Sequence, residues 1–70
     1  MKGAVAILEN VIETGKPKTI VFEEVAIARK ERSKFDQLIN NKESLHNKVV
    51  IHLDGNKITI KRDEMYDGLL

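Results

Sequence analysis

Two short segments near the C-terminus, residues 49–54 and 57–61, alternate apolar and polar side chains, as the two faces of a β-strand require. Only Gly55 and Asn56 lie between them, and both residue types accept the positive φ that tight hairpin turns demand. The sequence therefore predicts a β-hairpin over residues 48–62. A turn centred on Gly55 and Asn56 brings the apolar positions together on one face of the hairpin. The predicted facing pairs are Leu53 with Ile58 and Ile51 with Ile60.

The segments before the hairpin predict a helix and a strand. Apolar residues at helical spacing favour a first helix over residues 4–14, and Gly15 and Pro17 follow where helices end. Because residues 4–8 form a short apolar run, a buried strand there is the alternative. A cluster of β-branched and aromatic residues then predicts a strand over residues 18–22.

Between residues 24 and 41, apolar side chains recur every three or four residues, which predicts a helix with one apolar face. Within it, Ser33 and Asp36 have the spacing of a helix N-cap and a carboxylate in the first turn. A pair of shorter helices is therefore the alternative to a single helix. Residues 63–70 are too short a segment to assign to an element and are predicted as a frayed tail with at most one helical turn.

These elements predict an α+β fold, in which the helices cover one face of a small antiparallel sheet. Seventy residues suffice for a single small domain, residues 1–70. Because so small a core supplies only about 3–5 kcal/mol, we expect a homodimer. The predicted core consists of Ile7, Leu8, Val11, Ile12, Ile20, Phe22, Val25, Ala28, Phe35, Leu38, Ile39, Val49, Ile51, Leu53, Ile58 and Ile60.

The composition excludes several classes of site. The absence of cysteine excludes disulfides, thiolate metal sites and cysteine nucleophiles, and it favours a cytoplasmic protein. No segment approaches the ~20 apolar residues of a membrane span. His46 and His52 lack the ligand spacing of a metal site, and no serine or threonine lies in a nucleophile motif. We therefore expect no metal, no cofactor, no small-molecule substrate and no enzymatic activity.

Charges are unevenly distributed along the chain, although its net charge is only +1. Residues 1–28 carry three lysines and four glutamates, whereas residues 29–62 carry nine basic and four acidic side chains. Residues 63–70 carry three acidic side chains and no basic one. Because a divided charge distribution steers partners of opposite charge, it predicts two alternative binding surfaces.

An acidic surface is the favoured hypothesis. Glu9 and Glu13 lie four residues apart on the predicted first helix, where their like charges repel and no basic residue is spaced to relieve them. Such carboxylates can stand where phosphates would when a protein docks on a basic, DNA-binding partner. We therefore expect a small inhibitor or effector with a protein partner, of the kind that mobile elements carry. The predicted protein-binding residues are Glu9, Glu13, Glu23, Glu24, Asp63, Glu64 and Asp67.

The alternative hypothesis is a DNA-binding regulator. The predicted order of elements is similar to that of winged-helix DNA-binding domains, in which a helix enters the major groove and a hairpin contacts the DNA backbone. The glycine typical of a helix-turn-helix turn is absent from residues 28–33. The resemblance implies DNA contacts from the basic segment 29–34 and from the hairpin 48–62. The predicted nucleic-acid-binding residues are Arg29, Lys30, Arg32, Lys34, Gln37, Asn40, Lys57, Lys61 and Arg62.

Overall fold

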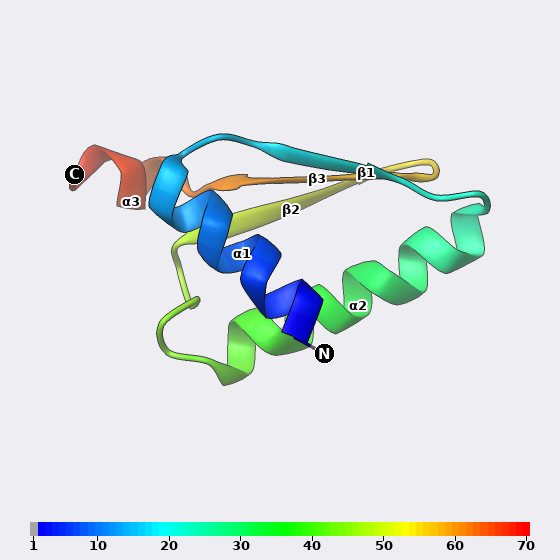
Figure 1. Cartoon of the computed structure of the whole chain (residues 1–70), viewed down its shortest axis with the longest axis horizontal. Helices are drawn as coiled ribbons and strands as arrows, with labels where there is room; N and C mark the ends of the chain where they lie inside the picture. The colour runs from blue at the N-terminus through cyan, green and yellow to red at the C-terminus, as the bar shows by residue number, and fades with distance from the viewer. Residues whose placement is uncertain (1) are drawn as a thin grey trace.

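The computed structural model describes residues 2–70, which form three helices and a three-stranded sheet (Figure 1). In chain order the elements are α1 (Lys2–Thr14), β1 (Lys18–Val21), α2 (Val25–Asn41), β2 (Val49–Asp54), β3 (Lys57–Arg62) and α3 (Glu64–Gly68). The strand order is β1-β3-β2, and β3 is antiparallel to both neighbours. Both α1 and α2 lie on the same side of the sheet, and the described residues leave its other face open (Figure 1). The predicted α+β fold is confirmed.

The hairpin has the predicted register, with Leu53 opposite Ile58 and Ile51 opposite Ile60. In its turn only Gly55 has a positive φ, 60°, which is the pattern of a type II′ turn. Asn56 has a different role, since its Nδ2 donates to the Phe22 carbonyl at 2.7 Å and its carbonyl accepts from the Phe22 N–H at 2.8 Å. These two hydrogen bonds tie the hairpin tip to the connection between β1 and α2.

The structure decides between the alternatives left open for the helices. α1 includes residues 4–8, so the predicted alternative of a strand there is wrong. α2 is one continuous helix of 17 residues, and the helix pair is also wrong. Ser33 is exposed in the middle of α2, because the apolar positions on both sides of it keep one helical phase.

Within the predicted tail, residues 64–68 form the short helix α3. Its first turn is capped by Asp63, whose Oδ1 accepts a hydrogen bond from the Met65 N–H at 2.9 Å. A carboxylate at this position satisfies a donor that the helix itself leaves unpaired. Met65 is 83% exposed. The short helix is therefore stabilised by its N-cap and not by burial of its side chains.

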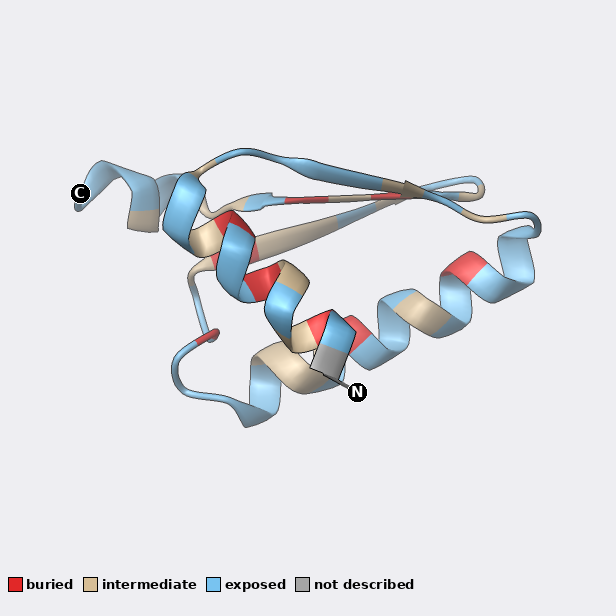
Figure 2. Cartoon of the chain, in the orientation of Figure 1, coloured by how far each residue is buried: buried red, intermediate tan, exposed pale blue. Residues whose placement is uncertain are grey.

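The core lies between the two long helices and the sheet (Figure 2). Its buried residues come from α1, α2, the loop after α2, β2 and β3: Ala4, Leu8, Val11, Phe35, Leu45, Val49, Ile58 and Ile60. Two of these, Ala4 and Leu45, were not among the predicted core residues. Leu45 is fully buried although it lies outside the helices and strands, where periodicity gives no signal.

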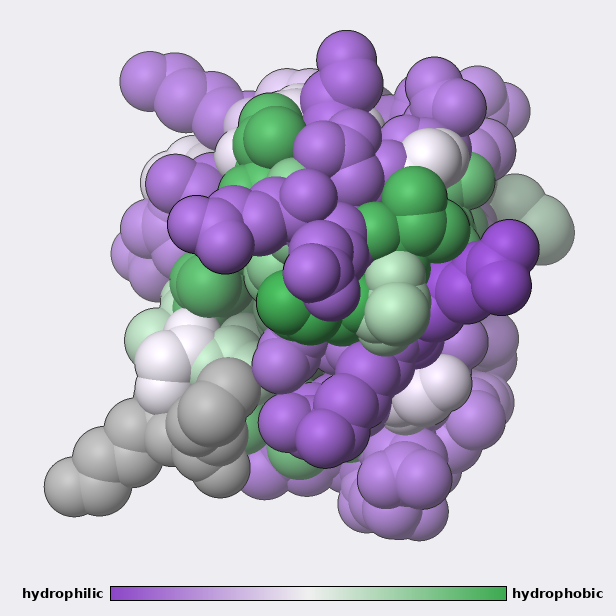
Figure 3. All heavy atoms as spheres, turned by 90° about the vertical axis from the view of Figure 1, so that its right-hand side faces the viewer, coloured by the Kyte–Doolittle hydropathy of each residue, from purple (hydrophilic) through white to green (hydrophobic). Residues whose placement is uncertain are grey.

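Val25 is the predicted core residue that the structure contradicts most clearly, since it is 44% exposed. It is the first residue of α2, one turn before Ala28, which is fully buried. Val21 and Ile27 are exposed at the same end of the molecule, where apolar side chains emerge between charged ones (Figure 3). The apolar stripe of α2 therefore begins to pack at Ala28.

Candidate functional site

The predicted acidic surface is divided by the fold. Glu9 and Glu13 are exposed on α1, whereas Glu23 and Glu24 are exposed in the connection that leads into α2. That connection and α3 occupy opposite ends of the longest axis of the molecule, which measures 36 Å (Figure 1). The carboxylates of Glu23 and Glu24 therefore lie apart from the acidic side chains of α3.

Two of the acidic residues at the other end have structural partners. Asp63 caps α3, and Asp67 accepts a hydrogen bond from Arg62 Nη1 at 2.9 Å. Glu64 is exposed in the first turn of α3. Of the predicted acidic set, Glu9 and Glu13 are thus the pair that shares one helix surface and makes no ion pair with the described residues.

Arg62 was predicted to bind nucleic acid, and the structure uses it inside the fold. Its Nε donates to the carbonyl of Ile12 at 2.9 Å, and its Nη2 donates to the carbonyl of Glu13 at 3.1 Å. Both carbonyls belong to the last turn of α1, where a helix has acceptors without partners and a partial negative charge. The side chain of Arg62 is only 19% exposed. Arg62 is therefore the C-terminal cap of α1.

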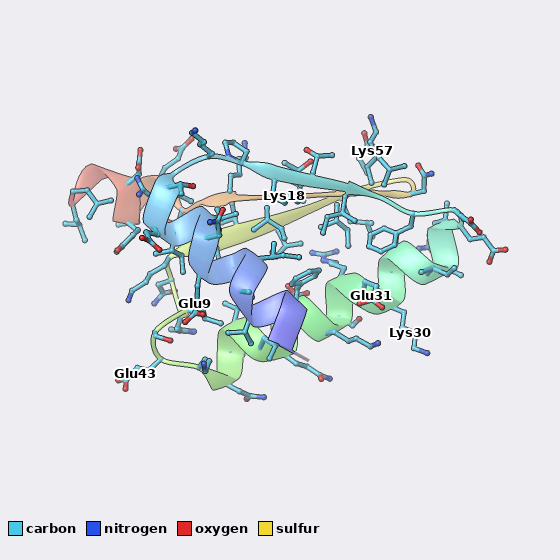
Figure 4. All side chains as sticks on the ribbon, in the orientation of Figure 1. Glu9, Lys18, Lys30, Glu31, Glu43 and Lys57 are labelled. Atoms are coloured by element: carbon cyan, nitrogen blue, oxygen red, sulfur yellow. The ribbon has the colours of Figure 1, made fainter. Side chains whose placement is uncertain are left out.

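Lys57 and Lys61 project from the open face of the sheet. They alternate along β3 with Ile58 and Ile60, both fully buried beneath the sheet, so their side chains point to the opposite face. Figure 4 shows Lys57 and Lys30 pointing away from the molecule on opposite sides. The hairpin lysines and the basic residues of α2 therefore do not form one surface.

The solvent side of α2 carries a continuous polar surface, here called the α2 face. At 3.6 residues per turn its members fall within an arc of about 100°, directed away from buried Ala28 and Phe35. Every member is exposed, and only one of them is apolar. The α2 face consists of Ala26, Arg29, Lys30, Ser33, Gln37 and Asn40.

The two acidic residues of α2 lie outside this arc, and each has a basic partner. Glu31 Oε1 lies 3.3 Å from Lys34 Nζ, and Asp36 Oδ2 lies 3.4 Å from Arg32 Nε. Arg32 and Lys34, both predicted to contact nucleic acid, thus sit beside carboxylates that offset their charge. No ion pair among the described residues involves Arg29 or Lys30. The positive charge of the α2 face therefore belongs to these two side chains.

The side-chain amides of the α2 face are likewise free of hydrogen bonds to other described residues. Neither Gln37 nor Asn40 has a side-chain hydrogen bond to another described residue. The sequence predicts Gln37 and Asn40 as binding residues, whereas it predicts Ser33 as a helix cap. The position of Ser33 follows from helical periodicity, since it lies four residues before Gln37 and seven before Asn40.

Among the described residues, no group of three or more His, Asp or Glu side chains could hold a metal ion, and no polar or charged residue is buried. His52 is exposed opposite Thr59 on the open face of the sheet. No described helix has the length and apolar character needed to cross a membrane.

Comparisons with protein-family models, with curated proteins and with solved structures returned no match to the chain.

Proposed function

We propose that the protein is a small DNA-binding regulator that inserts the α2 face into the major groove of duplex DNA. The observation that carries the proposal is the composition of that face: two cations and three hydrogen-bonding side chains, all exposed, with no carboxylate among them. Arginine and lysine contact phosphates, and serine, asparagine and glutamine contact both phosphates and base edges. In this mode of binding, DNA is contacted from α2 and not from the hairpin.

The dimensions of α2 suit this role. A helix of 17 residues is about 25 Å long and about 10–12 Å wide, and the major groove of B-DNA is about 12 Å wide. α2 also forms the side of the molecule remote from the sheet, so α1 and the strands do not cover its outer surface (Figure 1). The helix pair and the hairpin lysines have no part in this mode of binding.

The test is fluorescence anisotropy of a labelled random-sequence duplex, titrated with the protein at low and moderate salt. We expect binding that weakens as the salt concentration rises, because lysine and arginine side chains that contact phosphates displace the counterions bound there. The variant Arg29→Glu with Lys30→Glu should lose this binding. Its matched control is Lys57→Glu with Lys61→Glu, which changes the net charge equally but on the open face of the sheet, and which should retain most of the binding.

Two results would contradict the proposal. One is the absence of wild-type binding at tens of micromolar protein in low salt. The other is a reversed pattern, in which the change at Lys57 and Lys61 abolishes binding while the change at Arg29 and Lys30 does not. Circular dichroism of each variant checks that its fold is intact.

A second candidate function is docking on a basic protein through Glu9 and Glu13. It is favoured by the exposure of both carboxylates and by their lack of an ion-pair partner among the described residues. Replacing both by lysine should abolish this docking and leave DNA binding unchanged or stronger. If the wild-type protein binds no DNA, an affinity capture with this variant as the matched control becomes the leading test.

A further inference from the structure

The side chains of the α2 face are ordered across its width. Ser33, Gln37 and Asn40 follow one another at intervals of four and three residues, so they lie above one another along a single stripe of the helix. Arg29 and Lys30 stand about 50° to either side of the centre of this stripe, at 100° per residue. Neutral hydrogen-bonding groups therefore occupy the middle of the α2 face, and cations occupy its two margins.

This arrangement matches the cross-section of a DNA groove. The floor of the major groove presents base edges, and its two walls carry phosphates. From Ser33 to Asn40 the stripe rises about 10.5 Å, which is the height of about three stacked base pairs. The stripe thus has the length of a short recognition site.

The chemistry of the stripe favours adenine. Asparagine and glutamine can each form a bidentate pair with adenine, in which the side-chain carbonyl accepts from the N6 amino group and the side-chain N–H donates to N7. Gln37 and Asn40 are free to do so, because neither amide is held by a hydrogen bond to another described residue. Serine can form hydrogen bonds with several different bases, so Ser33 adds little discrimination between them.

We infer that Gln37 and Asn40 are specificity-determining residues that recognise adenines within a site of about three base pairs, while Arg29 and Lys30 hold the flanking phosphates. This inference rests on the proposed function and assigns separate roles to the residues of the same face. The ligand is B-form DNA, because the major groove of A-form RNA is too narrow and deep for side chains to contact its base edges.

The experiment is selection from a library of duplexes with a randomised central segment, followed by anisotropy titrations on the selected duplex and on a scrambled one. The wild-type protein should enrich adenines at neighbouring positions and prefer the selected duplex. The variant Gln37→Ala with Asn40→Ala should lose this preference by at least about fivefold while it keeps the salt dependence of the wild type.

The variant Arg29→Ala with Lys30→Ala should show the opposite behaviour. Its affinity should fall for both duplexes, and the slope of log K against log salt should decrease in magnitude by about 2, while the preference for the selected duplex remains. The matched control is Asn10→Ala, which changes an exposed asparagine on α1. It should alter neither the preference for the selected duplex nor the salt dependence of binding.

The outcomes separate this inference from the proposed function. If the wild-type protein binds duplexes but enriches no sequence, or if the variant at Gln37 and Asn40 keeps the preference, the assignment of specificity is wrong and DNA binding stands. If the wild-type protein binds no duplex, both proposals are wrong. If the variant at Gln37 and Asn40 instead loses affinity for both duplexes equally, those amides contact the backbone and the inference fails.

Discussion

Arg62 and Arg29 carry the same charge in two regions that use it differently. At the end of β3, the guanidinium of Arg62 lies over the last turn of α1 and donates to two main-chain carbonyls and to Asp67. On α2, Arg29 is exposed and makes no ion pair with a described residue. One basic side chain stabilises the fold, and the other is presented to solvent.

Charge along a sequence therefore indicates a binding surface only once the charged side chains that are paired within the fold have been set aside. Nine basic residues lie between positions 29 and 62. Arg62 caps the end of α1, and Arg32 and Lys34 form ion pairs with carboxylates of α2. What remains on α2 is smaller than the predicted basic surface, but it is undivided.

The largest effect is expected where α2 is held to the rest of the molecule. Phe35 is 4% exposed in the core, so Phe35→Ala should lower the free energy of unfolding by about 3–5 kcal/mol, comparable to the total stability of a domain of this size. Urea denaturation measures it. An unchanged midpoint would mean that α2 does not pack through this face.

Arg62→Ala should come next, because it removes two charge-assisted hydrogen bonds from the last turn of α1. We expect a loss of about 2 kcal/mol in the same denaturation experiment. Asp67→Ala is the control, since Asp67 is 60% exposed and its removal should cost less than about 1 kcal/mol. Equal effects of the two substitutions would show that the ion pair, rather than the cap, is what Arg62 contributes.

Gly15→Ala should lower the free energy of unfolding by about 1–2 kcal/mol, because Gly15 has a φ of 74°, which is strained for a residue with a Cβ atom. A methyl group there would also stand 2.7 Å from Nη1 of Arg62. In the Arg62→Ala background that contact is gone, so the cost of Gly15→Ala should be smaller. Strict additivity in this double-mutant cycle would argue against the close approach of the guanidinium to the helix end.

The smallest change in stability is expected on the α2 face. Arg29→Ala and Lys30→Ala should each alter the free energy of unfolding by less than about 0.5 kcal/mol, as is usual for exposed positions. Thermal unfolding followed by circular dichroism checks this. A large destabilisation would mean that these side chains, like Arg62, serve the fold.

The sequence predicted the elements that depend on local pattern and missed contacts between distant segments. The hairpin register followed from the alternation around Gly55 and Asn56 and is confirmed. Burial of Leu45 could not be predicted, because a residue outside regular elements has no periodicity to indicate which way it points. The hydrogen bonds of Arg62 span about fifty positions of the chain, so no local signal indicates them.

The candidate site was predictable in part. The segment that contains Arg29, Lys30, Gln37 and Asn40 was identified from charge and residue type. Its restriction to one face required the helical phase to be continuous across Ser33, which the cap pattern left undecided. The separation of Lys57 and Lys61 from α2 depends on how the sheet packs on the helices, and this is a tertiary property.

The most direct test of the central claim, that α2 presents the binding surface while the basic residues of the hairpin do not, is amide chemical-shift mapping by NMR with a short duplex. We predict that the shifts perturbed by DNA cluster on residues 26–40 and spare the strands β2 and β3. Perturbations centred on Lys57 and Lys61, or on Glu9 and Glu13, with α2 unaffected would contradict the account.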